Sequence, residues 1–451
     1  MSPTEKVNRY NELSQKYGDP WIWGIYIMLL LISIVESYSA SSREIATQGI
    51  YMPVIKQCAF LGLGLACVIL LQRIDYNKPR FLYAMVPGLA VFTVFSLVYV
   101  MLFGETINGA RRAMTIIPHF LTLQPAELAK LSIVTLLSYI FAKTQKNKDI
   151  STKGIVAAAF AVGLYGALMI RSGLTNTLLL IAISGSMLLI GGAQLKKIGI
   201  LMVFFGIMFG FFFIIKSSND KKDEVLSEMQ TTNTLDGVVV VEEPTSGDSP
   251  DRLRSGTWKN RVKEWLHRDS LVFRPITTKN QQEMFSRMAQ AHGGLLGVGI
   301  GKSRECSRLP LAFSDYIYSI IVEELGFFLG GMFVMLLYLS LLGRAAMIVR
   351  HSKRVLPSLL VIGMASFITF QALFHMAINV GVFPVSGQPL PLISKGGTSI
   401  LVISIAFGVM LSVSRTIANY GNKKNKVEET LVIEGLDAEN PTEIPAKNVW
   451  K

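Results

Sequence analysis

Apolar runs of membrane-spanning length dominate the chain. A spanning helix needs about 20 mostly apolar residues, and ten segments approach that length. They are residues 21–40, 54–72, 82–103, 127–142, 154–170, 174–192, 197–216, 314–343, 356–382 and 397–416. The pattern predicts an all-α integral membrane protein with about ten transmembrane helices.

The charges between these runs predict an orientation. Basic residues gather in the N-terminal tail, in every even-numbered connection and after the last run. Because cytoplasmic loops are enriched in Lys and Arg, we expect both termini in the cytoplasm. The longest connection, 217–313 between runs seven and eight, then faces outward. Its first part, 217–256, has the polar composition of a disordered insert.

Composition agrees with this picture. Of the 451 residues, 51% are hydrophobic and 17% are charged, against about 25% charged in soluble domains. The net charge of +13 is explained by the basic loops, so nucleic-acid binding is not expected. The polar tail 1–20 predicts no cleavable signal peptide, and the tail 417–451 is expected to be flexible. The three cysteines have no disulfide or zinc spacing.

Two arginines lie where the orientation does not favour them. Arg111 and Arg112 fall in the connection between runs three and four, on the predicted outer side. A guanidinium group grips a phosphate through paired N–H groups. These residues are therefore candidates for an anion site, and the simpler alternative is an interfacial loop held by a salt bridge.

The fourth run carries charges at membrane depth. Gln124 precedes Pro125, and proline is favoured at the first position of a helix. Glu127 and Lys130 lie three residues apart on that helix, so we expect an ion pair. Ionisable groups in a membrane are costly and usually functional. Gln124, Glu127 and Lys130 are therefore candidate substrate-binding residues.

A glycine-rich stretch covers residues 293–303. It resembles the phosphate loop of nucleotide-binding proteins, but Leu296 stands where the first glycine of that loop should be. We therefore reject an ATPase. We expect a turn in which glycine allows a lipid headgroup to approach the backbone.

The eighth run begins and continues with acids. Asp315 is expected to cap the helix, because a carboxylate accepts from free amides and favours the positive end of the dipole. Glu323 and Glu324 are adjacent acids within an apolar helix. Such acids are costly unless they are paired or line a polar cavity, so all three are candidate substrate-binding residues.

The connection before the last run cannot form a regular helix. Residues 379–399 contain three prolines and four glycines. Irregular backbone at membrane depth is tolerated only where protein buries it or where it lines a cavity. We therefore expect this segment to form the wall of a site, to which Ser394 and Lys395 belong.

Together these segments resemble the SEDS family (shape, elongation, division and sporulation), and its division branch more than its elongation branch. The similarity runs from about Ile50 to Arg415 and breaks at 217–256. It rests on Asn-Gly-Ala-Arg-Arg at 108–112, Gln-Pro-Ala-Glu-Leu-Ala-Lys at 124–130, Ser-Asp-Tyr-Ile at 314–317, Glu-Glu-Leu-Gly at 323–326 and Pro-Leu-Ile-Ser…Gly-Gly at 391–397.

The resemblance implies a peptidoglycan glycosyltransferase that polymerises lipid II at the outer face of the cytoplasmic membrane. Such proteins act with a class B penicillin-binding protein, which cross-links the strands. In this reaction a carboxylate takes the proton of the attacking sugar hydroxyl. The departing undecaprenyl pyrophosphate needs cations, either Arg and Lys or a divalent metal such as Mg²⁺ or Mn²⁺.

The base proposed for the family is an Asp in the long outer loop, within an Asp-Pro-x-Gly-x-Gly-Tyr motif that this chain lacks. Asp269 is the one acid between Glu264 and Glu283, so we predict that it is the catalytic base, with Glu264 as the second choice. Two other departures are Arg171-Ser172-Gly173-Leu174, where many relatives have Pro-Asp-Leu-Gly, and Lys395, where an aromatic residue is commoner.

Two other functions fit part of the sequence. A lipid II flippase would use intramembrane acids and a broken helix such as 379–399, although the two halves show no inverted repeat. A non-catalytic division scaffold would explain the missing Asp-Pro motif. Replacing Asp269 with Ala distinguishes them, because only an enzyme would lose polymerisation.

Overall fold

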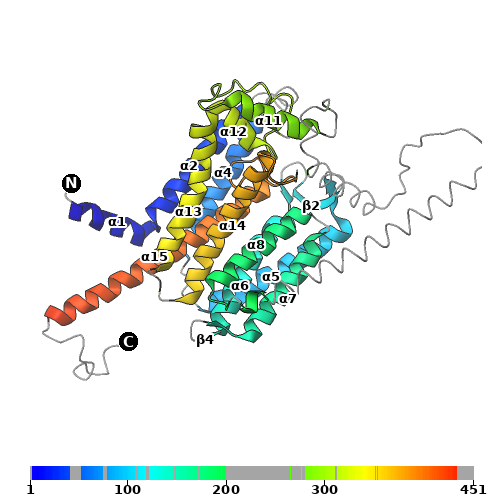
Figure 1. The fold of residues 1–451 in the computed structure, drawn as a ribbon. Coiled ribbons are helices and arrows are strands. Elements are labelled where there is room, and N and C mark those ends of the chain that lie inside the picture. The colour runs from blue at the N-terminus through cyan, green and yellow to red at the C-terminus, as the bar shows by residue number, and fades with distance from the viewer. Residues whose placement is uncertain are drawn as a thin grey trace, which may run out of the picture.

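The structure is a computed structural model that describes a large part of the chain and is nearly all helical (Figure 1). The described residues are 3–40, 52–74, 79–107, 110–117, 121–146, 149–170, 173–194, 196–199, 265, 276, 280–309, 312–350, 352, 354–384 and 386–433. Residues 200–216 of the predicted seventh span 197–216 and most of the loop 217–313 lie outside them.

Seven of the predicted spans are single long helices. They are α2 (Pro20–Ser39), α4 (Met52–Leu71), α5 (Pro79–Phe103), α6 (Pro125–Thr144), α7 (Thr152–Ile170), α14 (Val355–Asn379) and α15 (Gly397–Ile433). The sixth span is the shorter α8 (Leu174–Ile190). Within the described chain, eight helical stretches, with 317–350 counted as one, are long and apolar enough to cross a membrane. The membrane-protein prediction is confirmed, whereas the total of ten spans stays a prediction.

The predicted span 314–343 is wrong as one helix. The chain there forms α12 (Ile317–Gly326), the π-helix η2 (Phe327–Met332) and α13 (Phe333–Arg350). A Cβ on Gly330 would lie 2.5 Å from the carbonyl oxygen of Ile321. In a continuous helix these residues would be about 13 Å apart. The chain therefore folds back at Gly326, whose φ is +81°, and η2 lies beside α12.

Both predicted tails contain helix. In the first tail, α1 (Pro3–Tyr17) precedes Asp19, whose Oδ1 accepts from the amides of Trp21 at 2.9 Å and Ile22 at 3.3 Å and so caps α2. Arg344 of α13 donates to Oδ2 of Asp19 at 2.7 Å. Burial, followed by the nearby Asp19 carboxylate, raises the pKa of Tyr10 to about 12.

At the other end of the chain α15 continues to Ile433, so the first part of the tail expected to be flexible is helical. Residues 417–433 contain no proline that would end the helix. Figure 1 shows this extension projecting from the bundle beside α1.

Two small antiparallel sheets were not predicted. β1 (Glu105–Ile107), β2 (Ala110–Ile117) and β3 (Leu121–Leu123) pair in chain order just before α6. β4 (Gln145–Lys146) and β5 (Asp149–Ile150) form a tight hairpin after α6. Beside this hairpin, a 2.7 Å hydrogen bond from Lys197 lowers the pKa of Asp149.

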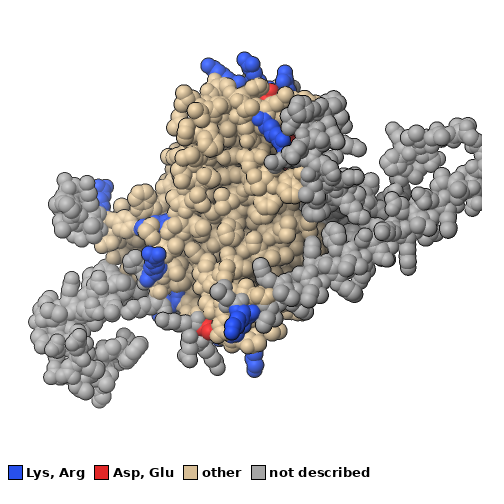
Figure 2. Space-filling view, viewed as in Figure 1, with Lys and Arg blue, Asp and Glu red and all other residues tan. Residues whose placement is uncertain are grey.

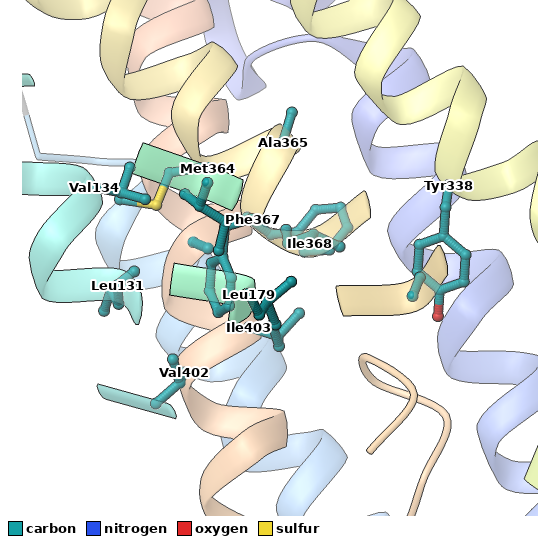
Figure 3. Close-up of a cluster of buried hydrophobic side chains, with 14 of the residues drawn as sticks. Leu131, Val134, Leu179, Tyr338, Met364, Ala365, Phe367, Ile368, Val402 and Ile403 are labelled. Atoms are coloured by element: carbon teal, nitrogen blue, oxygen red, sulfur yellow. The ribbon is translucent and has the colours of Figure 1, made fainter. Parts of the chain in front are cut away.

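The core lies around α6, α14 and α15. In an apolar 18-residue stretch of each of these three helices, between 72% and 78% of the residues are buried, against 28% in α4 and α5. The three therefore form the centre, and α4 and α5 the periphery. Figure 3 shows apolar side chains from these helices meeting those of α8, including Leu131, Leu179, Phe367 and Ile403. Lysines and arginines gather at the two ends of the face in Figure 2 and leave an uncharged band between them, as expected of a membrane-embedded bundle.

Candidate functional site

A charged group lies in the apolar centre of the bundle. The ammonium group of Lys130 lies 2.7 Å from Oε1 of Glu127, and both side chains are almost fully buried. The predicted ion pair is therefore confirmed. The same ammonium donates to Oε1 of Gln371 on α14 at 2.7 Å, and Gln371 in turn donates to Glu127 at 3.3 Å. These three residues form the Lys130 triad, which joins α6 to α14.

Gln371 begins a polar stripe that sequence reasoning missed. Gln371, His375 and Asn379 follow one another at intervals of four residues, so they share one face of α14. All three are buried. The signal was present in the sequence, because three polar residues at helical spacing interrupt an otherwise apolar run. The stripe leads from the Lys130 triad to the end of α14.

The irregular segment after α14 packs against this stripe. His375 donates from Nδ1 to the carbonyl oxygen of Gln388 at 2.6 Å. The side chain of Gln388 donates to Asn176 of α8 at 2.9 Å, and Gln371 donates to the carbonyl of Pro389 at 3.3 Å. The segment is thus held in place by polar side chains from two helices.

Ser394 closes the segment on itself. Its hydroxyl accepts from the amide of Leu390 at 2.7 Å and donates to the carbonyl oxygen of Ser314 at 2.7 Å. Between these residues Leu392 adopts a φ of +65°, which is rare for a side chain other than Gly or Asn. Lys395 lies over the ring of Phe313 at 4.9 Å, which places its positive charge beside the residues that lead into α12.

Asp315 does not cap α12, so that prediction is wrong. The helix begins after Tyr316, whose side chain does not cap it. Asp315 instead accepts from the Ser314 hydroxyl at 2.9 Å. The first turn of α12 is held by Asn379, whose Oδ1 accepts from the Ser319 hydroxyl at 2.9 Å and whose Nδ2 donates to the Asp315 carbonyl at 3.1 Å. The positive end of α12 therefore lies next to the polar stripe.

Glu323 and Glu324 are buried and point to different partners. Glu323 accepts from the Ser303 hydroxyl and, at 3.0 Å, from the amide of Arg304. Glu324 accepts from the hydroxyl of Ser39 on α2. They connect α12 to its neighbours near its C-terminal end, whereas Asp315 lies before its N-terminus.

The glycine-rich stretch packs on α12. The amides of Val298 and Gly299 donate to the carbonyls of Glu323 and Glu324, each at 2.9 Å. A Cβ on Gly297 would lie 2.3 Å from the Glu324 carbonyl oxygen. The glycines therefore allow two backbone segments to touch, α11 (Gln281–Gly293) leading into the turn that packs on α12. The approach of a lipid headgroup to the rest of the stretch stays a prediction.

The other predicted site residues are placed as follows. Arg111 and Arg112 lie on β2, and nothing is described of their side chains. Gln124 immediately precedes α6 and is half-buried. Asp269 and Glu264 fall outside the described residues. Within the residues that are described, no three His, Cys, Asp or Glu side chains come together to hold a metal.

The site as described can therefore hold a fixed charge distribution in an apolar surrounding. Lys130 and Glu127 neutralise each other, and Gln371 links this ion pair to the irregular segment by a hydrogen bond to the Pro389 carbonyl. Preorganised dipoles and charges of this kind act strongly on a ligand because a dry interior screens them weakly.

Comparison with known proteins decides the family. The family model of the FtsW, RodA and SpoVE proteins, described as "Cell cycle protein", matches residues 20–237 and 253–419. The chain belongs to this family. The gap in the match falls within the polar insert that interrupts the resemblance.

Named relatives and solved structures agree. The probable peptidoglycan glycosyltransferase FtsW of Xanthomonas oryzae is 27% identical over 91% of this chain and 75% of its own. Stage V sporulation protein E of Bacillus subtilis is 26% identical over 87% and 95%. A structure described as "Structural coordination of polymerization and crosslinking by a peptidoglycan synthase complex" has a TM-score of 0.61 and 21% identity, covering 89% and 98%. RodA of Thermus thermophilus, with a TM-score of 0.56, 20% identity and coverage of 88% and 97%, shares the fold as well.

Proposed function

We propose that this family member is a peptidoglycan glycosyltransferase that polymerises lipid II into glycan strands during cell division. The observation that carries the proposal is the match of almost the whole chain to proteins named peptidoglycan glycosyltransferase FtsW. The buried Lys130 triad and the irregular segment 379–399, called the wall segment, support it. Polar and charged groups inside a membrane bundle are costly and are usually retained for function.

The reaction joins a sugar hydroxyl of one substrate to the anomeric carbon of another. A base takes the hydroxyl proton, the new glycosidic bond forms, and the bond to undecaprenyl pyrophosphate breaks. We assign Asp269 as this base from its position in the sequence, with Glu264 as the second choice. Arg111 and Arg112, next to the start of α6, are the candidates to neutralise the departing pyrophosphate.

The Lys130 triad orients the site in this proposal. Lys130 is fully buried and already bound to two oxygens, so it is suited to fixing α6 and the wall segment rather than to leaving its partners. Ser394 and Asn379 hold the wall segment and the start of α12 in the same way. Gln124, Asp315 and Lys395 lie at the edges of this polar interior, where a substrate could reach them.

A divalent metal such as Mg²⁺ or Mn²⁺ would assist the departure of the pyrophosphate. Such ions bind phosphate oxygens together with one or two carboxylates. In this proposal the pyrophosphate oxygens of the substrate supply part of the ligands.

We further propose that the protein works with a class B penicillin-binding transpeptidase at the division septum, with both termini in the cytoplasm. The structural neighbour described as a complex for polymerization and crosslinking supports such a partner. The basic loops support the orientation. Polymerisation by the protein alone at the rate of the complex would overturn the dependence on a partner.

The test is lipid II polymerisation in detergent by the protein bound to a partner whose transpeptidase serine has been replaced. Wild type should form glycan strands, and Asp269→Ala should form none. Asp149→Ala serves as the control. This aspartate lies in the β4–β5 hairpin, which follows the C-terminal end of α6, whereas the candidate site lies at the start of α6. Strands from Asp269→Ala would move the base to Glu264. No strands from wild type, with the complex intact and metal supplied, would refute the enzyme and favour lipid transport or a scaffold.

A further inference from the structure

Three polar atoms beside the end of α14 are buried without a hydrogen-bond partner in the described part of the chain. They are Nε2 of His375, Oε1 of Gln388 and the hydroxyl oxygen of Ser386. His375 and Gln388 are 1% and 5% exposed. Because buried polar atoms in folded proteins are almost always hydrogen-bonded, these three atoms mark a place where a further group binds.

Hydrogen bonds and one close approach bring Asp315 to the same place. The ring of His375 contacts the Gln388 carbonyl, with Nδ1 at 2.6 Å from the oxygen. A Cβ on Gly387 would lie 2.9 Å from Oδ2 of Asp315. The amide nitrogen of Asn379 donates to the backbone carbonyls of both His375, at 2.9 Å, and Asp315, at 3.1 Å. We call His375, Gln388 and Asp315 the acceptor cluster.

The atoms that this cluster offers are hydrogen-bond acceptors. A carbonyl oxygen only accepts, so Nδ1 of His375 carries the proton, and Nε2 of the neutral ring presents a lone pair. A neutral ring is expected because a buried charge without a partner is costly. Gln388 donates from its side-chain nitrogen to Asn176 at 2.9 Å, which leaves its oxygen to accept. The carboxylate of Asp315 is an acceptor as well.

A group of acceptors does not suit a phosphate. A pyrophosphate offers acceptor oxygens of its own and would face the negative charge of Asp315. The lysines beside the cluster are engaged elsewhere, since Lys130 donates to two oxygens of its triad and Lys395 lies over the ring of Phe313. The matching ligand carries several O–H and N–H groups. An amino sugar does so through its hydroxyl and acetamido groups.

Access to the cluster leads through the wall segment. Gly387 is exposed and directly precedes the buried Gln388. Residues 386–388 belong to neither a helix nor a strand, so a shift of this short stretch opens the cluster without breaking a regular element.

We propose that the acceptor cluster binds the sugar part of the lipid substrate by accepting hydrogen bonds from its hydroxyl and acetamido N–H groups. The inference rests on the proposed function and divides the substrate between two places. The acceptor cluster takes the sugar, whereas Arg111 and Arg112 remain the candidates for the pyrophosphate.

The test compares two ligands that share the lipid and the pyrophosphate, lipid II and undecaprenyl pyrophosphate. Their binding to the purified full chain is measured in nanodiscs with EDTA and without the transpeptidase partner, so that polymerisation does not intervene. His375→Asn keeps an amide N–H for the Gln388 carbonyl but has no atom in the place of Nε2. It should weaken lipid II binding by about three- to tenfold, the loss of one neutral hydrogen bond, and leave undecaprenyl pyrophosphate binding unchanged.

Two further variants make the result specific. Gln388→Met removes Oε1 and should show the same selective loss. Thr369→Val is the matched control, because Thr369 is also buried on α14 but donates to the Tyr338 carbonyl of α13 at 3.0 Å. It should change neither affinity.

The other outcomes overturn the sugar site. Equal weakening of both ligands by His375→Asn would indicate a structural role, and no change with either ligand would indicate a buried water. Stabilisation of wild type but not of Asp315→Asn by added Na⁺ or Mg²⁺ would indicate a cation site. Equal affinity of wild type for the two ligands would exclude a sugar contact without any variant. Because binding is measured without turnover, a wild type that forms no glycan strands refutes the proposed reaction separately.

Discussion

Replacing Lys130 by Met removes the one cation of the buried triad while keeping the length of the side chain. Glu127, which is 2% exposed, would then keep its charge with a single hydrogen bond, from Gln371 at 3.3 Å. Breaking a buried ion pair on one side costs about 3–5 kcal/mol. The unfolding equilibrium constant should therefore rise by about 150- to 5000-fold.

The assay is unfolding in mixed micelles with increasing denaturing detergent, followed by tryptophan fluorescence. Lys197→Met is the matched control, because Lys197 also lies 2.7 Å from a carboxylate but in a partly exposed pair, where little change is expected. Lys130→Met with Glu127→Leu should recover most of the lost stability, since no charge is then left unpaired. The reasoning fails if Lys130→Met costs no more than Lys197→Met, or if the double variant is as unstable as the single one.

Other changes test the wall, the turn and the metal. Gly301→Ala should cost about 1–2 kcal/mol for its φ of +75° alone, and Gly297→Ala should cost clearly more because its Cβ meets the Glu324 carbonyl; equal losses of unfolding free energy would contradict the packing role. Asn379→Leu should cost about 1–3 kcal/mol by leaving the start of α12 without its hydrogen bonds, and it should reduce polymerisation more than it reduces lipid II binding; an unchanged rate would exclude a role for α12 in the site. Chelation with EDTA should slow polymerisation and added Mg²⁺ should restore it, without shifting the thermal midpoint of the substrate-free protein; a shift in that midpoint would indicate a structural metal instead.

Features that depend on near neighbours in the chain were predictable. The apolar runs gave the positions of most helices because a helix in a membrane satisfies its own backbone. Pro125 marked the start of α6, and the ion pair of Glu127 and Lys130 followed from their spacing. The polar stripe on α14 could have been found by the same periodicity.

The sequence by itself determined the class of protein, the course of most helices and the family, because hydrophobic length and local motifs carry that information. The tertiary structure alone decided what the polar residues contact. Lys130 meets Gln371 across 241 residues, and Ser39 meets Glu324 across 285 residues. The reversal at Gly326 was also invisible, since its cause is the close approach of the glycine-rich turn to α12. Composition and periodicity describe one helix at a time, whereas a buried charge is stabilised by whichever helix lies opposite.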